Sequence, residues 1–284
     1  MKYRHSYHAG NFADVHKHVA LLALLSALER KDKGFLYLDT HAGRGSYDLS
    51  TPTAEAAAGI GQLTQAHFEA AELRAYAQAL TQLRAALKHP HLYGGSALLA
   101  RVVLRPQDRA VCIEQQGGEA HLLEQDMATL AARAPGPQVR VERADGYQRL
   151  KAYLPPPERR GLTFIDPPYE EQEDFARVTD ALAQSLKRFP TGVAAAWYPI
   201  KDERSTRIWQ AGCARAVAAP LLASELWLFR RDSRVALNGS GLMIMNPPHL
   251  LLERMQVWQP ELVRALHGSA DAGSSATMVS ESAP

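Results

Sequence analysis

The sequence predicts an α/β fold, a doubly wound Rossmann-like sheet with a small helical insertion, and three observations lead to this prediction. Short apolar, β-prone runs alternate with stretches of helical spacing along most of the chain. Four of these runs end at an acidic residue, namely Asp39, Glu114, Asp145 and Asp166. A glycine-containing loop follows the first of them. Because the carboxyl ends of parallel strands share one edge of a sheet, these residues are expected to line a ligand pocket there.

Composition narrows the class of protein. The 284 residues are 46% hydrophobic and 22% charged, which suits one large or two modest globular domains. The two cysteines, Cys112 and Cys213, form no C-x-x-C pair, so a reducing cytoplasm is expected and a disulfide framework is not. No signal core opens the chain and no run approaches the roughly 18 apolar residues of a membrane span, so a soluble protein is expected.

The first third of the chain is predicted to contain a helix, a strand and an insertion. Apolar residues recur at helical spacing from 17 to 28, and the basic, glycine-ended RKDKG closes that helix. A short apolar run over 35–38 ends at Asp39 in the loop DTHAGRGSY, as a buried strand would. Residues 54–89 are alanine-rich with leucines at helical intervals, and a proline and two glycines end this helical stretch.

Strands and helices then alternate to the end of the predicted sheet. Ser96 is placed to cap the helix that follows it. The expected elements are helices over 97–104, 120–133 and 147–153, and strands over 110–113, 139–141, 162–165, 193–197, 225–229 and 241–245.

These patterns divide the chain into four parts. They are an N-terminal arm with the start of the main domain (1–50), the helical insertion (51–93), the rest of the main domain (94–266) and a flexible tail rich in Ser, Ala and Gly (267–284).

Two loops carry the candidate chemistry. In LTFIDPPYE, two prolines remove backbone donors and end the strand abruptly, which leaves Asp166 at its carboxyl end. The loop after Asp39 reads D-x-x-x-G-x-G but lacks the full dinucleotide pattern G-x-G-x-x-G. A cofactor smaller than a dinucleotide is therefore favoured.

Asp166-Pro167-Pro168-Tyr169 matches the D/N-P-P-Y/F motif of S-adenosylmethionine-dependent amino-methyltransferases, and the chain resembles these enzymes. The stretches YRHSYHAGNFADVHKH, LDTHAGRGSY, GGSALLARVVL, ADGYQRL and RRGLTFIDPPYE resemble the bacterial 23S ribosomal RNA adenine-N6 methyltransferase family that carries a helical insertion. The likeness extends to about Pro248, although Gly94 stands where that family is expected to have proline.

The motif suits methylation of an adenine. The N6 lone pair is delocalised into the ring, so the amine becomes nucleophilic when acceptors draw its hydrogens out of the ring plane. Asp166 and the carbonyl of Pro167 can accept them, Pro168 stiffens the loop, and Tyr169 offers a face on which an extruded base can stack. Neither cysteine lies in the kind of motif that a C5-pyrimidine methyltransferase needs for its nucleophile.

The resemblance also implies the ligand contacts. It assigns Glu114 to the ribose hydroxyls of S-adenosylmethionine, Asp145 and Gly146 to the adenine edge, and Lys17, His18, His41 and Ser96 to the methionine part. Tyr3 and Arg4 of the N-terminal arm are expected near the substrate base, and the catalytic residues are Asp166, Pro167 and Tyr169.

Two other features are expected to be structural. His16 and His18 are two residues apart on a helix and point to different faces, so no metal is expected. The stretch NPPH over 246–249 lacks the aspartate and the aromatic residue of the DPPY loop, so a strand exit is favoured there.

The sequence therefore predicts an RNA-binding, cytoplasmic enzyme of rRNA processing that forms N6-methyladenine in 23S ribosomal RNA with S-adenosylmethionine as methyl donor. No membrane or metal partner is expected, and a monomer is favoured. The alternatives are a guanine-N2 RNA methyltransferase, an adenine-N6 DNA methyltransferase and a non-catalytic RNA-binding module. The target nucleotide is left open.

Overall fold

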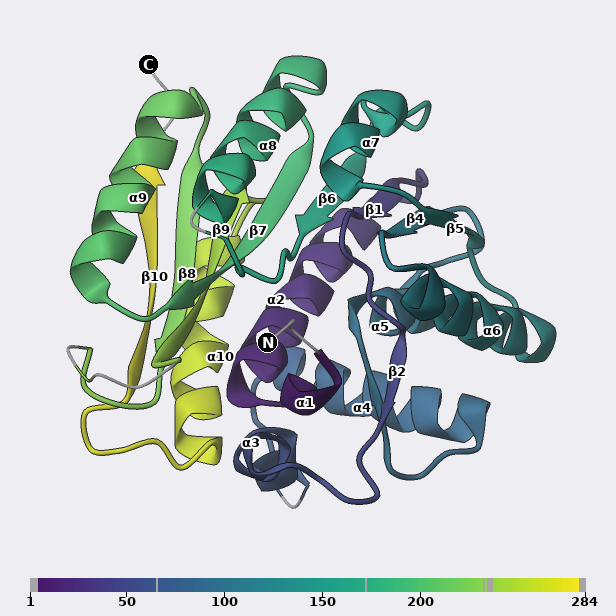
Figure 1. Cartoon of the computed structure of the whole chain (residues 1–284), viewed down its shortest axis with the longest axis horizontal. Coiled ribbons are helices and arrows are strands. Elements are labelled where there is room, and N and C mark those ends of the chain that lie inside the picture. The colour runs from purple at the N-terminus through teal and green to yellow at the C-terminus, as the bar shows by residue number, and fades with distance from the viewer. Residues whose placement is uncertain (1–4, 65, 172, 232, 234–236, 281–284) are drawn as a thin grey trace.

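A computed structural model of the protein describes residues 5–64, 66–171, 173–231, 233 and 237–280 (Figure 1). Its centre is an eight-stranded sheet in the order β10-β8-β9-β7-β6-β1-β4-β5. The strands are β1 Leu36–Asp39, β4 Arg109–Glu114, β5 Gln138–Arg143, β6 Gly161–Ile165, β7 Val193–Ile200, β8 Leu221–Trp227, β9 Gly239–Met245 and β10 Gly273–Ser280.

The sheet confirms the predicted doubly wound α/β class. β1 pairs in parallel with β4 on one side and with β6 on the other, and β5 and β7 extend the parallel part outward. β9, β8 and β10 complete it with antiparallel pairs. The chain therefore reverses its direction of winding beside β1, which is the point where open α/β sheets bind ligands.

Helices cover both faces because side chains alternate along each strand. One face packs on α2 (Phe12–Glu29), α5 (Ser96–Val103), α6 (Gly117–Arg133) and α10 (Leu251–Ala265), and the other on α7 (Gly146–Tyr153), α8 (Asp174–Arg188) and α9 (Glu203–Ala216). No helix of the described residues is long and apolar enough to cross a membrane.

The segment 51–93 contains short helices and one long helix beside the main sheet. It comprises α3 (Ala54–Ala58), the 3-10 helix η1 (Ile60–Leu63), α4 (Ala71–Leu87) and β3 (Leu92–Gly94), which pairs with β2 (Ser46–Asp48). Leu73, Tyr76 and Leu80 of α4 are buried in the same apolar cluster as α2. A short helix, α1 (His5–His8), precedes α2.

Three sequence expectations need correction. Residues 273–280 of the expected flexible tail form β10. The edge of β8 offers unpaired backbone groups, and the backbone of small polar residues can form hydrogen bonds with them as well as that of apolar residues. Ser96 does not cap α5: Gly95 occupies the N-cap and Ser96 is the first helical residue. The strand expected over 225–229 is β8, which covers 221–227. It ends at Trp227, because this is the last residue of β8 that pairs with β9.

Candidate active site

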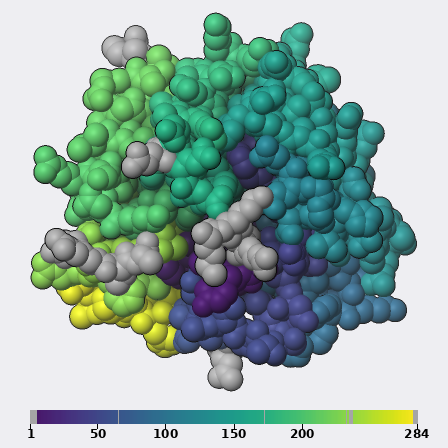
Figure 2. Space-filling model, viewed as in Figure 1, coloured from purple at the N-terminus to yellow at the C-terminus, as the bar shows by residue number. Residues whose placement is uncertain are grey.

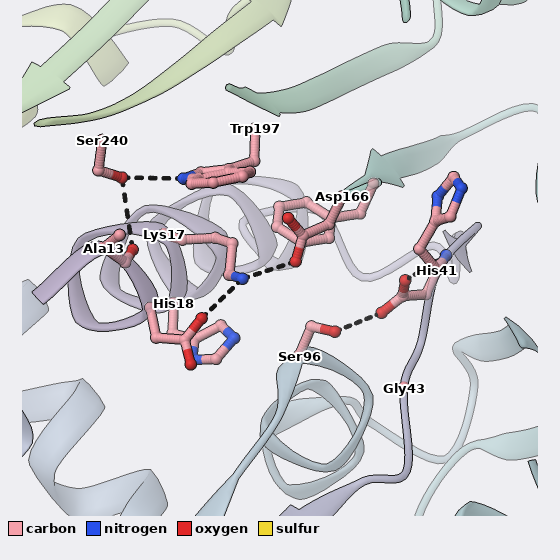
Figure 3. Close-up of polar contacts among 12 residues, drawn as sticks. Ala13, Lys17, His18, His41, Gly43, Ser96, Asp166, Trp197 and Ser240 are labelled. Atoms are coloured by element: carbon pink, nitrogen blue, oxygen red, sulfur yellow. Dashed lines mark hydrogen bonds and ion pairs between the residues drawn. The ribbon is translucent and has the colours of Figure 1, made fainter. Parts of the chain in front are cut away.

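The candidate site lies where β1, β4 and β6 end and the start of α2 meets them, and Figure 3 shows Lys17 and Asp166 of this site. In the space-filling view, the beginning of the described chain, in purple, reaches the surface between the green half of the molecule and the blue insertion (Figure 2). Asp166 follows β6, Glu114 ends β4, and Lys17 projects from α2 toward Asp166. Residues about 150 positions apart in sequence are thus neighbours here.

Lys17 forms two buried ion pairs. Its Nζ lies 2.6 Å from Asp166 Oδ2 and 2.8 Å from Asp14 Oδ1, and only 4% of the Lys17 side chain is exposed. Burial alone would lower the pKa of Lys17, but the two carboxylates outweigh burial and raise that pKa. The ammonium group therefore stays charged, and it holds Asp166 in one orientation.

The DPPY loop is fixed by aromatic contacts. Tyr169 has a φ of 51°, a left-handed conformation that non-glycine residues rarely adopt. Its hydroxyl donates to the carbonyl of Trp197 at 2.5 Å. The Tyr169 ring centroid lies 4.7 Å from that of Phe175 and 5.6 Å from that of Trp197. Pro167 is buried, whereas Pro168 is exposed at the turn.

Glu114 holds the glycine-containing loop after β1. The amide of Gly43 donates to Glu114 Oε2 at 2.9 Å, and the amide of Gln116 donates to Oε1 at 2.7 Å. Gly43 has a φ of 63° and Gly45 a φ of 91°, values that favour glycine. Burial raises the pKa of Glu114 despite these bonds. Because each carboxylate oxygen has two lone pairs, Glu114 can still accept hydrogen bonds from a ligand.

Asp39 is turned inward, unlike the other acids at the strand ends. It is fully buried, and its Oδ2 accepts hydrogen bonds from Ser96 Oγ at 2.6 Å and Tyr37 Oη at 2.8 Å. Burial raises the pKa of Asp39 to about 6, although these donors lower it. Asp39 thus links β1 to α5, and its carboxylate is not accessible to a ligand.

The fourth acid, Asp145, caps α7. Its Oδ1 accepts from the amides of Tyr147 at 2.9 Å and Gln148 at 3.2 Å. A Cβ at Gly146 would lie 2.0 Å from the carbonyl oxygen of Thr40, so only glycine permits this approach of α7 to β1.

His41 lies beside Tyr147 of α7. Its ring centroid lies 4.9 Å from that of Tyr147, and burial lowers the pKa of His41 to about 4. The imidazole is therefore neutral near pH 7.

The predicted site residues do not all meet. Lys17, Asp166 and Tyr169 lie together, and Ser96 and His41 lie beside Asp39. His18 is buried and its Nδ1 lies 2.8 Å from the hydroxyl of Tyr93. Tyr3 and Arg4 lie outside the described residues.

Sequence reasoning missed three further residues at the site: Asp14, Tyr147 and Trp197. Asp14 could have been found, since it stands three residues before Lys17 on the same helix. Tyr147 has a buried hydroxyl with no hydrogen-bond partner among the described residues. Trp197 lies in a strand from elsewhere in the chain, and no local signal marks it.

The chemistry of this set is that of a group of hydrogen-bond acceptors suited to a polar organic ligand. It offers carboxylates at two strand ends, an unpaired phenol and a fixed cation beside Asp166. Within the described residues, no cluster of three or more His, Cys, Asp or Glu side chains is arranged to hold a metal ion. The doubly wound sheet with the DPPY loop at its ligand edge defines a Rossmann-like methyltransferase.

The family is shown by comparison with known proteins. The family model described as "Ribosomal RNA large subunit methyltransferase D, RlmJ" matches residues 32–278, and the chain belongs to this family. The family resemblance drawn from the sequence motifs is thereby confirmed.

Named relatives and a solved structure agree. The chain is 36% identical over 270 residues to ribosomal RNA large subunit methyltransferase J of Haemophilus influenzae, which covers 94% of each protein. It is 38% identical over 259 residues, 90% of each protein, to the Escherichia coli K12 protein of the same name. The crystal structure of a Legionella pneumophila protein, 32% identical, superposes with a TM-score of 0.80 over 95% of this chain and 97% of that one.

Proposed function

We propose that this protein transfers a methyl group from S-adenosylmethionine to the N6 amine of an adenine in 23S ribosomal RNA. The observation that carries the proposal is the carboxylate of Asp166, fixed by Lys17 through Oδ2 at 2.6 Å. Its Oδ1 makes no hydrogen bond with any described residue and is left to accept one from a substrate amine. Support for an RNA substrate comes from the relatives, which are named as methyltransferases of the large ribosomal subunit RNA.

Asp166 and Pro167 prepare the amine. Asp166 Oδ1 and the carbonyl of Pro167 accept the two N6 hydrogens, so the nitrogen lone pair turns out of the ring plane. Tyr169 offers its ring face to the extruded base, and its bond to Trp197 keeps that face in place. After transfer, the nitrogen loses a proton, for which Asp166 Oδ1 is the adjacent acceptor.

The cofactor contacts proposed from the resemblance fit the groups present. S-adenosylmethionine, when bound, supplies an electrophilic methyl group on its sulfonium sulfur. Glu114 keeps lone pairs for the ribose hydroxyls, and the unpaired phenol of Tyr147 offers a donor beside Asp145 and Gly146 at the adenine edge. His41 and His18 remain proposed for the methionine part.

Lys17 and Ser96 can also serve the methionine part without giving up their protein contacts. Two of the three Lys17 hydrogens go to Asp14 and Asp166, so one remains for a carboxylate. Ser96 donates its hydrogen to Asp39 and keeps its lone pairs for an amino group. Tyr3 and Arg4 are proposed as substrate contacts.

The deciding variant is Asp166→Ala. Methyl transfer should fall by about 100-fold or more, because the amine loses its acceptor, while the affinity for S-adenosylmethionine stays within about threefold. A tritium-transfer assay measures the first and calorimetry the second. Asp180→Ala, on the exposed side of α8, is the matched control and should keep wild-type turnover.

Product analysis separates the alternatives. The wild-type enzyme is given bulk RNA and bulk DNA, and the modified nucleoside is identified. Detection of N2-methylguanosine, or of N6-methyladenine in DNA only, would show that the enzyme catalyses one of the alternative reactions instead. Cofactor binding without transfer to any nucleic acid would favour a non-catalytic module, and near-normal turnover of Asp166→Ala would remove Asp166 from the role assigned to it.

A further inference from the structure

Trp197 of β7 contacts both side chains that flank Asp166. The Lys17 ammonium lies 5.4 Å from the centre of the indole ring, and the Tyr169 ring lies edge-on to it at 5.6 Å and 72°. The Tyr169 hydroxyl also donates to the Trp197 carbonyl. A shift or rotation of this indole would therefore move both neighbours of Asp166.

The indole is fixed from behind by Ser240 (Figure 3). Trp197 Nε1 lies 3.0 Å from Ser240 Oγ, and because an indole nitrogen only donates, Ser240 is the acceptor. Ser240 is fully buried in β9, the strand paired with β7. Its hydroxyl also lies 3.4 Å from the carbonyl of Ala13, one residue before Asp14.

Behind Ser240, a buried polar chain continues through His16. His16 Nδ1 lies 3.0 Å from Ser240 Oγ and Nε2 lies 3.2 Å from Ser224 Oγ. Gln259 Nε2 of α10 lies 2.7 Å from Ser224 Oγ and 3.3 Å from His16 Nε2. Each of these side chains is at most 1% exposed. Burial lowers the pKa of His16 to about 3, so its imidazole is neutral near pH 7.

Both neutral tautomers of His16 keep Ser240 bonded to Trp197. With the His16 proton on Nδ1, Ser240 accepts from His16 and from Trp197 and donates to the carbonyl of Ala13. With the proton on Nε2, His16 donates to Ser224, and Ser240 donates to His16 Nδ1 and still accepts from Trp197. In either tautomer, the Ser240 hydroxyl is held by His16 and is the acceptor for the Trp197 indole.

We infer that His16 and Ser240 are positioning residues of the methyltransferase site, which fix the Trp197 indole so that it holds Lys17 and Tyr169 around Asp166. The inference rests on the proposed function, in which those groups prepare the amine. Apolar side chains of similar volume often stabilise a core as well as a buried polar group does. The fully satisfied chain from α10 to Trp197 is therefore better explained by a demand for one geometry than by stability alone.

Ser240→Ala tests the inference with little risk to folding, since it removes one hydroxyl. Its kcat for methyl transfer should fall about tenfold, because small misplacements of catalytic groups are costly, and KM for S-adenosylmethionine should change by a smaller factor than kcat. Trp197→Phe keeps a ring but removes the donor, and it should lose a similar factor. The double variant should be no slower than the slower single variant, because both break the same bond.

The matched control is Ser185→Ala, which removes a buried serine hydroxyl that has no partner among the described residues. It should keep wild-type kcat. Wild-type kcat in Ser240→Ala, or losses that multiply in the double variant, would overturn the inference.

A second measurement does not depend on turnover. The sequence has four tryptophans, so indole 15N–1H spectra are simple, and Trp197→Phe assigns the Trp197 signal. That signal should shift and exchange faster with solvent in Ser240→Ala, and an unchanged signal would contradict the inference. The two possible failures can be told apart. If the wild-type enzyme transfers no methyl group, the proposed function is refuted. The indole signal does not depend on turnover, so it still shows whether Ser240 fixes Trp197.

Discussion

At the scale of single residues, the acids at the strand ends have different environments although the sequence pattern presents them alike. Asp39 is enclosed by Ser96 and Tyr37, whereas Glu114 and Asp166 are partly exposed at the ligand edge. Because all of them follow apolar runs, the sequence could predict their place but not which side of the strand each would face. That choice depends on contacts made by helices elsewhere in the chain.

Glu114 gives a prediction about cofactor affinity. Glu114→Ala should weaken S-adenosylmethionine binding by about 1–3 kcal/mol, because the ribose hydroxyls lose a charged acceptor and Gly43 loses the partner of its amide. Glu114→Gln keeps one acceptor oxygen and should lose less. Calorimetry on both variants measures the difference, and unchanged affinity in Glu114→Ala would make Glu114 a structural strand end only.

Asp39 gives a prediction about pH. Its pKa is about 6 in the folded protein and 3.8 ordinarily, so its stabilising contribution is complete below about pH 4 and is lost as pH rises through 6. The loss is on the order of 3 kcal/mol. Denaturant unfolding of wild type and Asp39→Asn at pH 4 and pH 7 measures it. The stability of the wild type relative to the variant should be higher at pH 4, and a pH-independent difference would contradict the raised pKa.

At the scale of elements, the sequence predicted strands best where the hydrophobic pattern agrees with the residues that end a strand. β1, β4 and β6 are short apolar runs that stop at an acid, and all three were placed within about two residues. β10 was missed because Gly and Ser make up half of the stretch 273–280, although Ala276 and Met278 pack on one apolar cluster and Val279 on another. Its pairing with β8 is set by backbone hydrogen bonds to a strand some 50 residues earlier, which no local pattern records.

A matched pair of charges tests whether β10 belongs to the folded core. Ala276 is buried between β8 and α10, and its carbonyl accepts from Gln256 at 3.2 Å, whereas Thr277 is exposed. Ala276→Asp should lower the free energy of unfolding by about 3 kcal/mol, because it buries an unpaired charge, and Thr277→Asp by less than about 1. Thermal unfolding compares them. Equal and small effects would mean that β10 is not docked.

At the scale of the whole molecule, charge is balanced locally. The formal net charge is +2, and several arginines are committed to internal partners: Arg44 to Glu119, Arg109 to Glu158, Arg231 to Glu203 and Glu225, and Arg254 to Glu72. The last of these neutralises an acid of the insertion. Long-range attraction of an RNA is therefore weak, and recognition must depend on contacts near the site.

This balance predicts a small RNA substrate. A short hairpin that contains the target adenine should be methylated without ribosomal proteins, since no separate RNA-binding domain is evident within the described residues and the insertion is nearly neutral. The contacts should come from the arm around Tyr3 and Arg4 and from the loop after Asp166. An unpaired or bulged adenine costs the least to extrude, so it should react faster than a paired one.

Methylation rates on the hairpin, on protein-free full-length RNA and on assembled subunits decide between local and extended recognition. Local recognition requires kcat/KM values for the hairpin and the full-length RNA within about tenfold of each other, because a factor of ten corresponds to about 1.4 kcal/mol, the size of one or two hydrogen bonds. A hairpin with the target adenine replaced by guanine is the control and should accept no methyl group. Activity confined to assembled subunits would refute local recognition, since it would mean that contacts far from Asp166 are needed to deliver the base.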